Sequence, residues 1–231
     1  MFNFNGPIFK LIDAIANSDW IEAIIYLALI VIVLLFAFPL HELFHALAAD
    51  RLGDNTARQM GRITLNPLKQ LNMWGSVLFL TLGFGWASVP VNYANFGENW
   101  RQKAALVALA GPAANLLLAI VFTGIYYLLN FLSLETLSTT PALIVVVAQS
   151  VMMIGVSINC FLLIFNLLPI PPLDGARAFI TLLPASVEPI FAQAQQFSFI
   201  ILIMLAQTSL FNVLVDQPAG VMSNWLLRLA S

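Results

Sequence analysis

Residues 21–49 read IEAIIYLALIVIVLLFAFPLHELFHALAA, and this stretch decides the fold. It is longer than the roughly 20 mostly apolar residues with which an α-helix crosses a lipid bilayer. A water-soluble domain has no need of an apolar run of this length. The stretch therefore predicts a membrane helix, which carries the polar side chains of His41, Glu42 and His45 near its C-terminal end.

The composition of the whole chain agrees with a membrane protein. Of its 231 residues, 61% are hydrophobic and 9% are charged, whereas about a quarter are charged in a typical soluble domain. The net charge of -2 comes from scattered single charges, which argues against a nucleic-acid partner. Cys160 is the only cysteine, so an internal disulfide is excluded, and we expect it to be a small buried apolar side chain. We predict one membrane domain covering residues 1–231.

Further long apolar segments follow the first one. They predict an all-α polytopic membrane protein with about four transmembrane helices, in a membrane core of residues 21–212. The prolines at 169, 171 and 172 end the third span because proline removes a backbone donor. Residues 213–231 are expected to form a C-terminal tail, too short in its apolar part to cross. The additional spans cover about residues 104–131, 142–168 and 189–211.

The segment from Trp74 to Asn92 is apolar but interrupted by Gly75, Gly83, Gly85 and Pro90. It is too short and too broken for a spanning helix. We interpret it as a re-entrant segment or β-hairpin, which membrane depth tolerates only where protein or a water-filled cavity receives its backbone polar groups.

The two ends of the chain give expectations about placement. Residues 1–20 have apolar side chains at helical spacing with charges between them, which predicts a short helix lying at the membrane interface. If residues 74–90 re-enter, most basic residues fall on one side, and the positive-inside rule assigns that side to the cytoplasm. These residues are Arg51, Arg58, Arg62, Lys69, Arg101, Lys103 and Arg177.

The only two histidines, His41 and His45, stand four residues apart and so share one face of a helix. Glu42 lies between them. In this HExxH arrangement two imidazoles reach one zinc ion, and the adjacent carboxylate is offset so that it can hydrogen-bond a water on the metal. Ionisable side chains inside an apolar helix are costly, which argues against an accidental match.

A catalytic zinc ion usually has three protein ligands, and no third histidine exists. The third must be an acid or Cys160. Asp174 closes the segment from Asn166 to Gly175, where prolines unwind the backbone after a long span. From the residues alone, a ligand and an ordinary turn aspartate before Gly175 are equally good interpretations.

At this point the sequence resembles the site-2 protease family of intramembrane zinc metalloproteases (the M50 type). The resemblance covers about residues 36–177 and rests on four motifs in order. They are His41-Glu42-Leu43-Phe44-His45; Phe84-Gly85-Trp86-Ala87 followed by Val89-Pro90-Val91-Asn92; Gly111-Pro112-Ala113-Ala114-Asn115; and Asn166 to Gly175. The length is similar to that of the compact bacterial branch, which has no PDZ or CBS domain.

The resemblance implies a single zinc ion held by His41, His45 and Asp174, with Glu42 as general base. It also implies a multi-pass protein of the bacterial cell membrane that cleaves a membrane protein in or near its transmembrane segment. Asn115 and Asn166 match asparagines that face the family's cleft, and as amides they could bind substrate or an oxyanion. Hydrogen bonding between helices is the alternative for both.

Two other functions remain to be weighed. A metal transporter also carries histidine and glutamate on membrane helices, but transport needs several intramembrane ligands along a path, and the sequence has one cluster. An inactive relative acting as a scaffold usually lacks a ligand or the base, and neither is lost here. We therefore expect an intramembrane zinc endopeptidase whose partners are a transmembrane substrate and the lipid bilayer.

Overall fold

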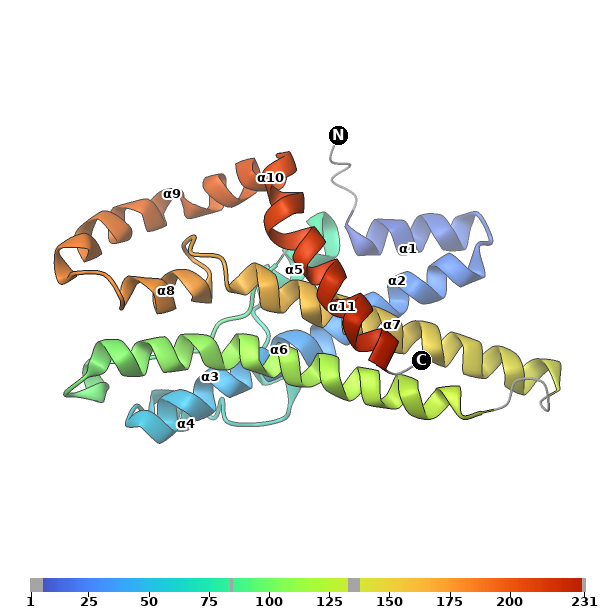
Figure 1. The fold of residues 1–231 in the computed structure, drawn as a ribbon, viewed down its shortest axis with the longest axis horizontal. Coiled ribbons are helices and arrows are strands. Elements are labelled where there is room, and N and C mark those ends of the chain that lie inside the picture. Colours follow the sequence, from blue (N-terminus) through green and yellow to red (C-terminus); the bar gives the residue numbers. More distant parts are fainter. Residues whose placement is uncertain (1–5, 84, 133–137, 230–231) are drawn as a thin grey trace.

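The long helices lie side by side along one axis in the computed structural model (Figure 1). The structure describes residues 6–83, 85–132 and 138–229. Three helical stretches there are long and apolar enough to cross a membrane, which confirms the first three predicted spans. The first is 33 residues long and joins α2 (Trp20–Ile32), the π-helix η1 (Val33–Ala37) and α3 (Phe38–Leu52). The others are α6 (Trp100–Asn130) and α7 (Thr139–Asn166).

The fourth predicted span is not a straight helix. It corresponds to α9 (Glu188–Ala206), which bends by 65° between Glu188–Ser198 and Ile200–Ala206. Each part alone is shorter than the roughly 20 residues that cross a bilayer. The prediction of about four spans is thus met by three straight spans and one bent pair.

The core is built around α6, which packs between α3 and α7. Small side chains allow this close packing, as is common between membrane helices. A Cβ atom on Gly155 of α7 would lie 2.6 Å from the Phe122 ring of α6. Cys160 is completely buried in the same cluster, as expected from the sequence.

The segment predicted to re-enter does double back. It consists of α5 (Met73–Leu82) and an irregular extended stretch, with the reversal at Gly83 in the left-handed region at φ +84°. The two limbs touch backbone to backbone, because a Cβ on Gly75 would lie 1.8 Å from the Trp86 carbonyl oxygen. No strand forms among the described residues of 73–92, so a helix with an extended limb replaces the β-hairpin alternative. Phe84 lies outside the described residues.

Both ends of the chain contain helices. The predicted N-terminal helix exists as α1 (Pro7–Ala16) and runs back along α2 as an antiparallel pair (Figure 1). Its position at the membrane interface stays a prediction. The C-terminal segment is one continuous helical stretch, α10 (Ser209–Phe211), η6 (Asn212–Asp216) and α11 (Gln217–Leu229), which crosses α7.

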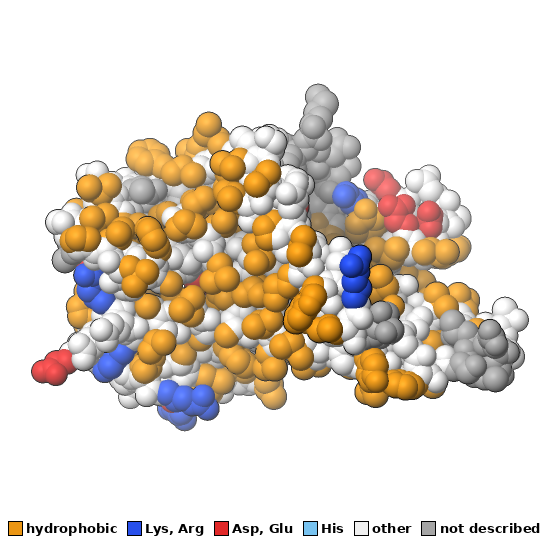
Figure 2. All heavy atoms as spheres, in the orientation of Figure 1, with side chains coloured by type: hydrophobic (Ala, Val, Ile, Leu, Met, Phe, Trp, Pro, Cys, Tyr) orange, Lys and Arg blue, Asp and Glu red, His pale blue; other side chains and the backbone are white. Residues whose placement is uncertain are grey.

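Short elements complete the chain and contact α3, α6 or α9. They are α4 (Thr56–Gln59), η2 (Pro67–Lys69), η3 (Tyr93–Phe96), α8 (Asp174–Ile180) and η5 (Ala185–Val187). Basic side chains lie at the end of the bundle where α3 ends and α6 begins, together with acidic partners such as Asp50 and Glu188. A group of acidic side chains lies near the turn from α1 to α2, with basic ones beside it (Figure 2). The positive-inside rule counts lysine and arginine side chains in short loops and assigns the face with more of them to the cytoplasm.

Candidate metal centre

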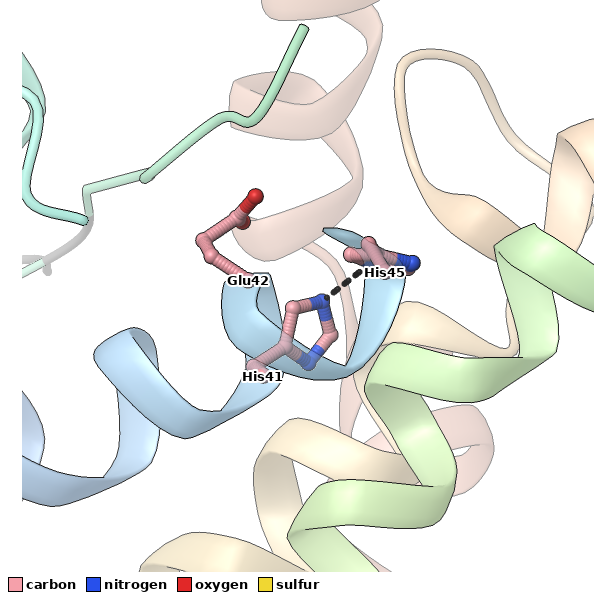
Figure 3. A group of neighbouring side chains, drawn as sticks. All are labelled: His41, Glu42 and His45. Atoms are coloured by element: carbon pink, nitrogen blue, oxygen red, sulfur yellow. Dashed lines mark hydrogen bonds between the residues drawn. The ribbon is translucent and has the colours of Figure 1, made fainter. Parts of the chain in front are cut away.

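His41 and His45 lie on consecutive turns of α3 and their rings meet edge to face (Figure 3). The two Nε2 atoms are 3.0 Å apart, and the side chains are buried, with 9% and 7% of each residue exposed. The π-helix η1 immediately precedes this part of α3. A π-turn inside a helix commonly marks a functional site, because it changes which residues face the neighbouring helix.

The outer nitrogens of both rings are fixed by α6. His45 Nδ1 lies 2.7 Å from the Val107 carbonyl oxygen, and His41 Nδ1 lies 2.7 Å from Asn115 Oδ1. Both acceptors are oxygens, so each Nδ1 carries the hydrogen and donates it. This assignment leaves a lone pair on each Nε2, which is the tautomer that binds a metal ion.

Gly111 of α6 leaves the space in front of those lone pairs. A Cβ atom at this position would lie 2.3 Å from His45 Nε2 and 2.5 Å from His41 Nε2. Val107, Gly111 and Asn115 are spaced four residues apart and so share the face of α6 that meets α3. From the sequence, Gly111 was seen only as part of a motif and as a helix breaker, and its role at the ligands was missed.

Asp174 completes the cluster from a distant part of the chain. Its Oδ2 atom lies 3.0 Å from His41 Nε2 and 3.2 Å from His45 Nε2. Asp174 begins α8, which folds tightly against the end of α7, because a Cβ on Gly175 would lie 2.2 Å from the Leu167 carbonyl oxygen. The glycine after the aspartate therefore serves close packing that aims Asp174 at the histidines.

The three converging atoms fit a zinc ion. In a tetrahedral site with metal–ligand distances of about 2.0–2.1 Å, neighbouring ligand atoms lie about 3.3–3.4 Å apart. The separations among the two Nε2 atoms and Asp174 Oδ2 are 3.0, 3.0 and 3.2 Å. Two nitrogen lone pairs and a carboxylate oxygen are all electron donors. A metal cation is the species that brings such donors together.

Glu42 occupies a different direction on the same turn of α3. It is 6% exposed, and its carboxylate points away from the facing rings (Figure 3). It nevertheless belongs to the group of potential ligand atoms that lie within 4.8 Å of one another. The Val89 backbone lies beside this carboxylate. The two acids are thus separated: Asp174 touches both Nε2 atoms, and Glu42 faces the extended limb.

A pocket of about 210 Å³ opens onto these residues. Its walls include the extended limb, the end of α7, and Arg177 of α8, which donates a hydrogen bond to the Tyr93 hydroxyl. Asn166 also lines the pocket, and its amide Nδ2 donates to the Leu162 carbonyl at 2.9 Å. Its amide has a second N–H and an acceptor oxygen beyond this hydrogen bond.

Asn115 contributes to the pocket wall but its side chain is completely buried behind His41. Its Nδ2 donates to Asn159 Oδ1 at 3.1 Å, and Asn159 Nδ2 donates to the Gly155 carbonyl at 2.8 Å. These contacts favour the alternative left open for Asn115, hydrogen bonding between helices. Asn159 was missed from the sequence, although a buried amide inside an apolar span is itself a signal.

Asp54 ties the end of α3 to the extended limb. Its side chain is fully buried and accepts hydrogen bonds from the Asn92 backbone N–H at 2.7 Å and from Asn95 Nδ2 at 2.7 Å. Thr56 donates to it as well, from its backbone and its hydroxyl. Burial raises the pKa of Asp54, but these hydrogen bonds outweigh it and hold the pKa below its ordinary value. The network fixes the limb relative to the histidine helix.

The membrane-spanning bundle and the cluster of two histidines and two acids are the features that a membrane metallopeptidase requires. Comparison with known proteins gives the family: the model of peptidase family M50 matches residues 26–208, and the chain belongs to this family. It is accordingly an intramembrane zinc metalloprotease and a multi-pass membrane protein. The resemblance seen in the sequence is confirmed.

Three relatives illustrate the similarity. YwhC of Bacillus subtilis is 40% identical over 203 residues, which cover 87% of this chain and 90% of the relative. Rip2 of Mycolicibacterium smegmatis is 33% identical over 228 residues, with 90% and 82% covered. Rip2 of Mycobacterium tuberculosis is 30% identical over 200 residues, with 81% and 71% covered. All three are named as candidate zinc metalloproteases. No solved structure matches the chain.

Proposed function

We propose that His41, His45 and Asp174 hold one zinc ion and that Glu42 is the general base in hydrolysis of a peptide bond of a membrane protein. The observation that carries the proposal is the convergence of His41 Nε2, His45 Nε2 and Asp174 Oδ2 to within 3.0–3.2 Å of one another. Glu42 lies close to this triangle without occupying a corner of it.

Bound zinc supplies a Lewis acid that polarises a carbonyl group and lowers the pKa of water towards about 7. The protein does the rest. Glu42 accepts the proton of the attacking water and returns it to the leaving amine. Asn115 and Val107 hold the two imidazoles in the ligating tautomer. Asn166, on the pocket wall, is the proposed donor to substrate or to the developing oxyanion.

The substrate is proposed to be a transmembrane segment that unwinds locally, because an intact helix keeps its carbonyls in internal hydrogen bonds. The pocket wall at Val89 and Val91 is extended backbone beside Glu42 and could pair with the unwound segment. The bacterial cell membrane is the proposed location, and the substrate protein is proposed to be cleaved in or near the bilayer.

A transporter would need a succession of ligands through the membrane. Within the described residues, one group of histidine, cysteine, aspartate and glutamate side chains is placed to hold a metal ion, and it is the group around His41. No second group continues from it through the part of the chain that the structure describes. The arrangement therefore favours hydrolysis over transport.

The proposed base is tested by Glu42→Gln, which keeps the shape of the side chain but cannot accept a proton. We expect the rate of cleavage of a reconstituted transmembrane reporter to fall by a factor of about 10² to 10⁴, which is the usual contribution of a general base. Zinc content should stay near one ion per chain by elemental analysis, since three other side chains hold the metal.

The matched control is Glu98→Gln, at an exposed acid in the loop before α6, which should retain full cleavage. Loss of zinc from Glu42→Gln would make Glu42 a ligand rather than the base. Zinc uptake into liposomes by the wild type, without cleavage of any membrane reporter, would support the transporter instead.

A further inference from the structure

A second cavity lies on the bundle, apart from the metal centre. It is a groove of about 560 Å³ between α2, α7 and α11, and it shares no lining residue with the pocket at His41. Its walls are mostly apolar. They consist of Ile25, Leu29, Met153, Ile154, Ser157, Ile158, Phe161, Asp216, Ala219, Gly220 and Ser223.

Asp216 is the only charged residue that lines this groove. Its carboxylate is exposed, and the described part of the chain offers it no ion pair or hydrogen bond. The walls belong to the interiors of two spanning helices: Ile25 and Leu29 in the first span, Met153 to Phe161 in α7. A carboxylate at such a depth is costly unless a partner neutralises it.

The helix holds Asp216 in this position. Val215, the preceding residue, is completely buried in the core beside Leu168 and Leu173. One and two turns later, Ala219 and Ser223 are buried, and α11 packs on α7. Asp216 is also the last residue of the π-helix η6, which like η1 before His41 is a π-turn within the described residues. Local π-turns are frequent at functional sites.

A second copy of this chain does not supply the missing charge. Residues 104–176 and 178–227 contain no lysine or arginine, and neither do residues 23–50. The cations of the spanning helices and of α11 stand near the helix ends, so no such helix of another copy brings one to the middle of its apolar stretch; they are Arg51, Arg101, Lys103 and Arg228. Charge complementarity points to a different membrane protein.

We propose that this groove binds a transmembrane helix of a partner protein that carries a lysine or arginine within its apolar span, paired with Asp216. The small residues Ala219 and Gly220 let the partner backbone approach closely, as small residues do between membrane helices. The groove is a docking surface separate from the metal centre, so its occupation does not require the chemistry proposed there.

The test uses model peptides in liposomes. Three leucine–alanine transmembrane peptides are made alike except for the central residue, which is lysine, leucine or glutamate. The full-length protein is labelled at Asn224→Cys, an exposed position on α11, while the native Cys160 is buried and unreactive. Energy transfer measures binding. We expect the lysine peptide to bind about tenfold more tightly than the leucine peptide.

Two variants decide whether Asp216 is responsible. Asp216→Asn should bind the lysine and leucine peptides equally, while Asp13→Asn, which removes an exposed acid on α1, should keep the preference. Asp216→Lys should instead prefer the glutamate peptide. Retained zinc content shows that each variant is folded.

Equal binding of the lysine and leucine peptides to the wild type would overturn the proposal. So would energy transfer between two labelled copies of the chain that is lost in Asp216→Asn, because the occupant would then be a second copy. Neither result depends on whether the metal centre hydrolyses peptides, so this proposal and the proposed function fail independently.

Discussion

The α-carbon of Gly111 faces the two imidazoles across the contact between α3 and α6. A methyl group there would lie 2.3 Å from one Nε2 atom and 2.5 Å from the other, where no real Cβ atom sits. These are also the atoms whose lone pairs converge with the Asp174 carboxylate. The absence of a side chain at Gly111 therefore leaves room for the two imidazoles that are proposed to hold the metal.

Replacing Gly111 by alanine should empty the metal centre. The added methyl group must push the histidine rings out of the geometry in which both face Asp174, so we expect zinc to fall well below one ion per chain and cleavage to be lost. Elemental analysis of the purified variant measures this.

The control lies on the same helix. Gly124 has open space around its Cβ position, so Gly124→Ala should keep its zinc. If Gly111→Ala were to retain full zinc, the packing of α6 against the two rings would have to be looser than described here.

At this scale the sequence predicts some site residues and not others. His41, Glu42 and His45 follow from spacing within one helix turn. Asp174 is 133 residues from His41. The residues alone therefore made a metal ligand and a turn aspartate equally good interpretations, and the family resemblance favoured the ligand. The support from Asn159 and Gly111 depends on which faces of α3, α6 and α7 meet, which local spacing does not specify.

Among the elements, the extended limb depends on a link outside the spans. Asp54, just after α3, holds the limb through the Asn92 backbone and the Asn95 side chain. The same carboxylate binds Thr56. Because Val89 and Val91 line the pocket a few residues before Asn92, the link sets the position of the pocket wall.

The link should depend on pH. The folded protein holds the pKa of Asp54 below its ordinary value, which is about 3.9 in an unfolded chain. Its contribution to stability is therefore complete above about pH 4 and disappears as the pH falls through the lower pKa of the folded state. Hydrogen exchange of residues 90–96, corrected for intrinsic rates, should show loss of protection in that acidic range.

Asp54→Asn should lose the same protection already at pH 7, since an amide offers one acceptor oxygen where the carboxylate offers two. Asp13→Asn, at an exposed acid, should behave as the wild type. Unchanged protection in Asp54→Asn would show that other contacts hold the limb.

Elements are predictable where length and hydropathy decide them. The three straight spans are long apolar runs, and they form as expected. The bend in α9 and the C-terminal helix were not predicted. In the latter, Asn212, Asp216 and Gln217 dilute the apolar signal, yet the helix forms because Val215, Ala219 and Leu226 are buried against the bundle.

For the whole molecule, the distribution of basic side chains predicts one orientation in the membrane. Single cysteines at Lys69 and Glu98 should react with an impermeant reagent from the cytoplasmic face, and a cysteine at Ser138 should react from the other. The native Cys160 is fully buried and gives little background. Positions 69 and 98 lie on either side of the re-entrant segment, so labelling from opposite faces would mean that this segment crosses.

The order in which the chain is made bears on when the molecule becomes active. The histidines lie in the first span, the asparagine that orients one of them lies in the second, and the carboxylate that meets both follows the third. A nascent chain emerging from a ribosome therefore carries the histidine motif long before it can assemble the complete centre. Most of the protein must be synthesised and inserted before the proposed centre can form, so we expect an unfinished chain to be unable to cut the neighbours among which it is being assembled.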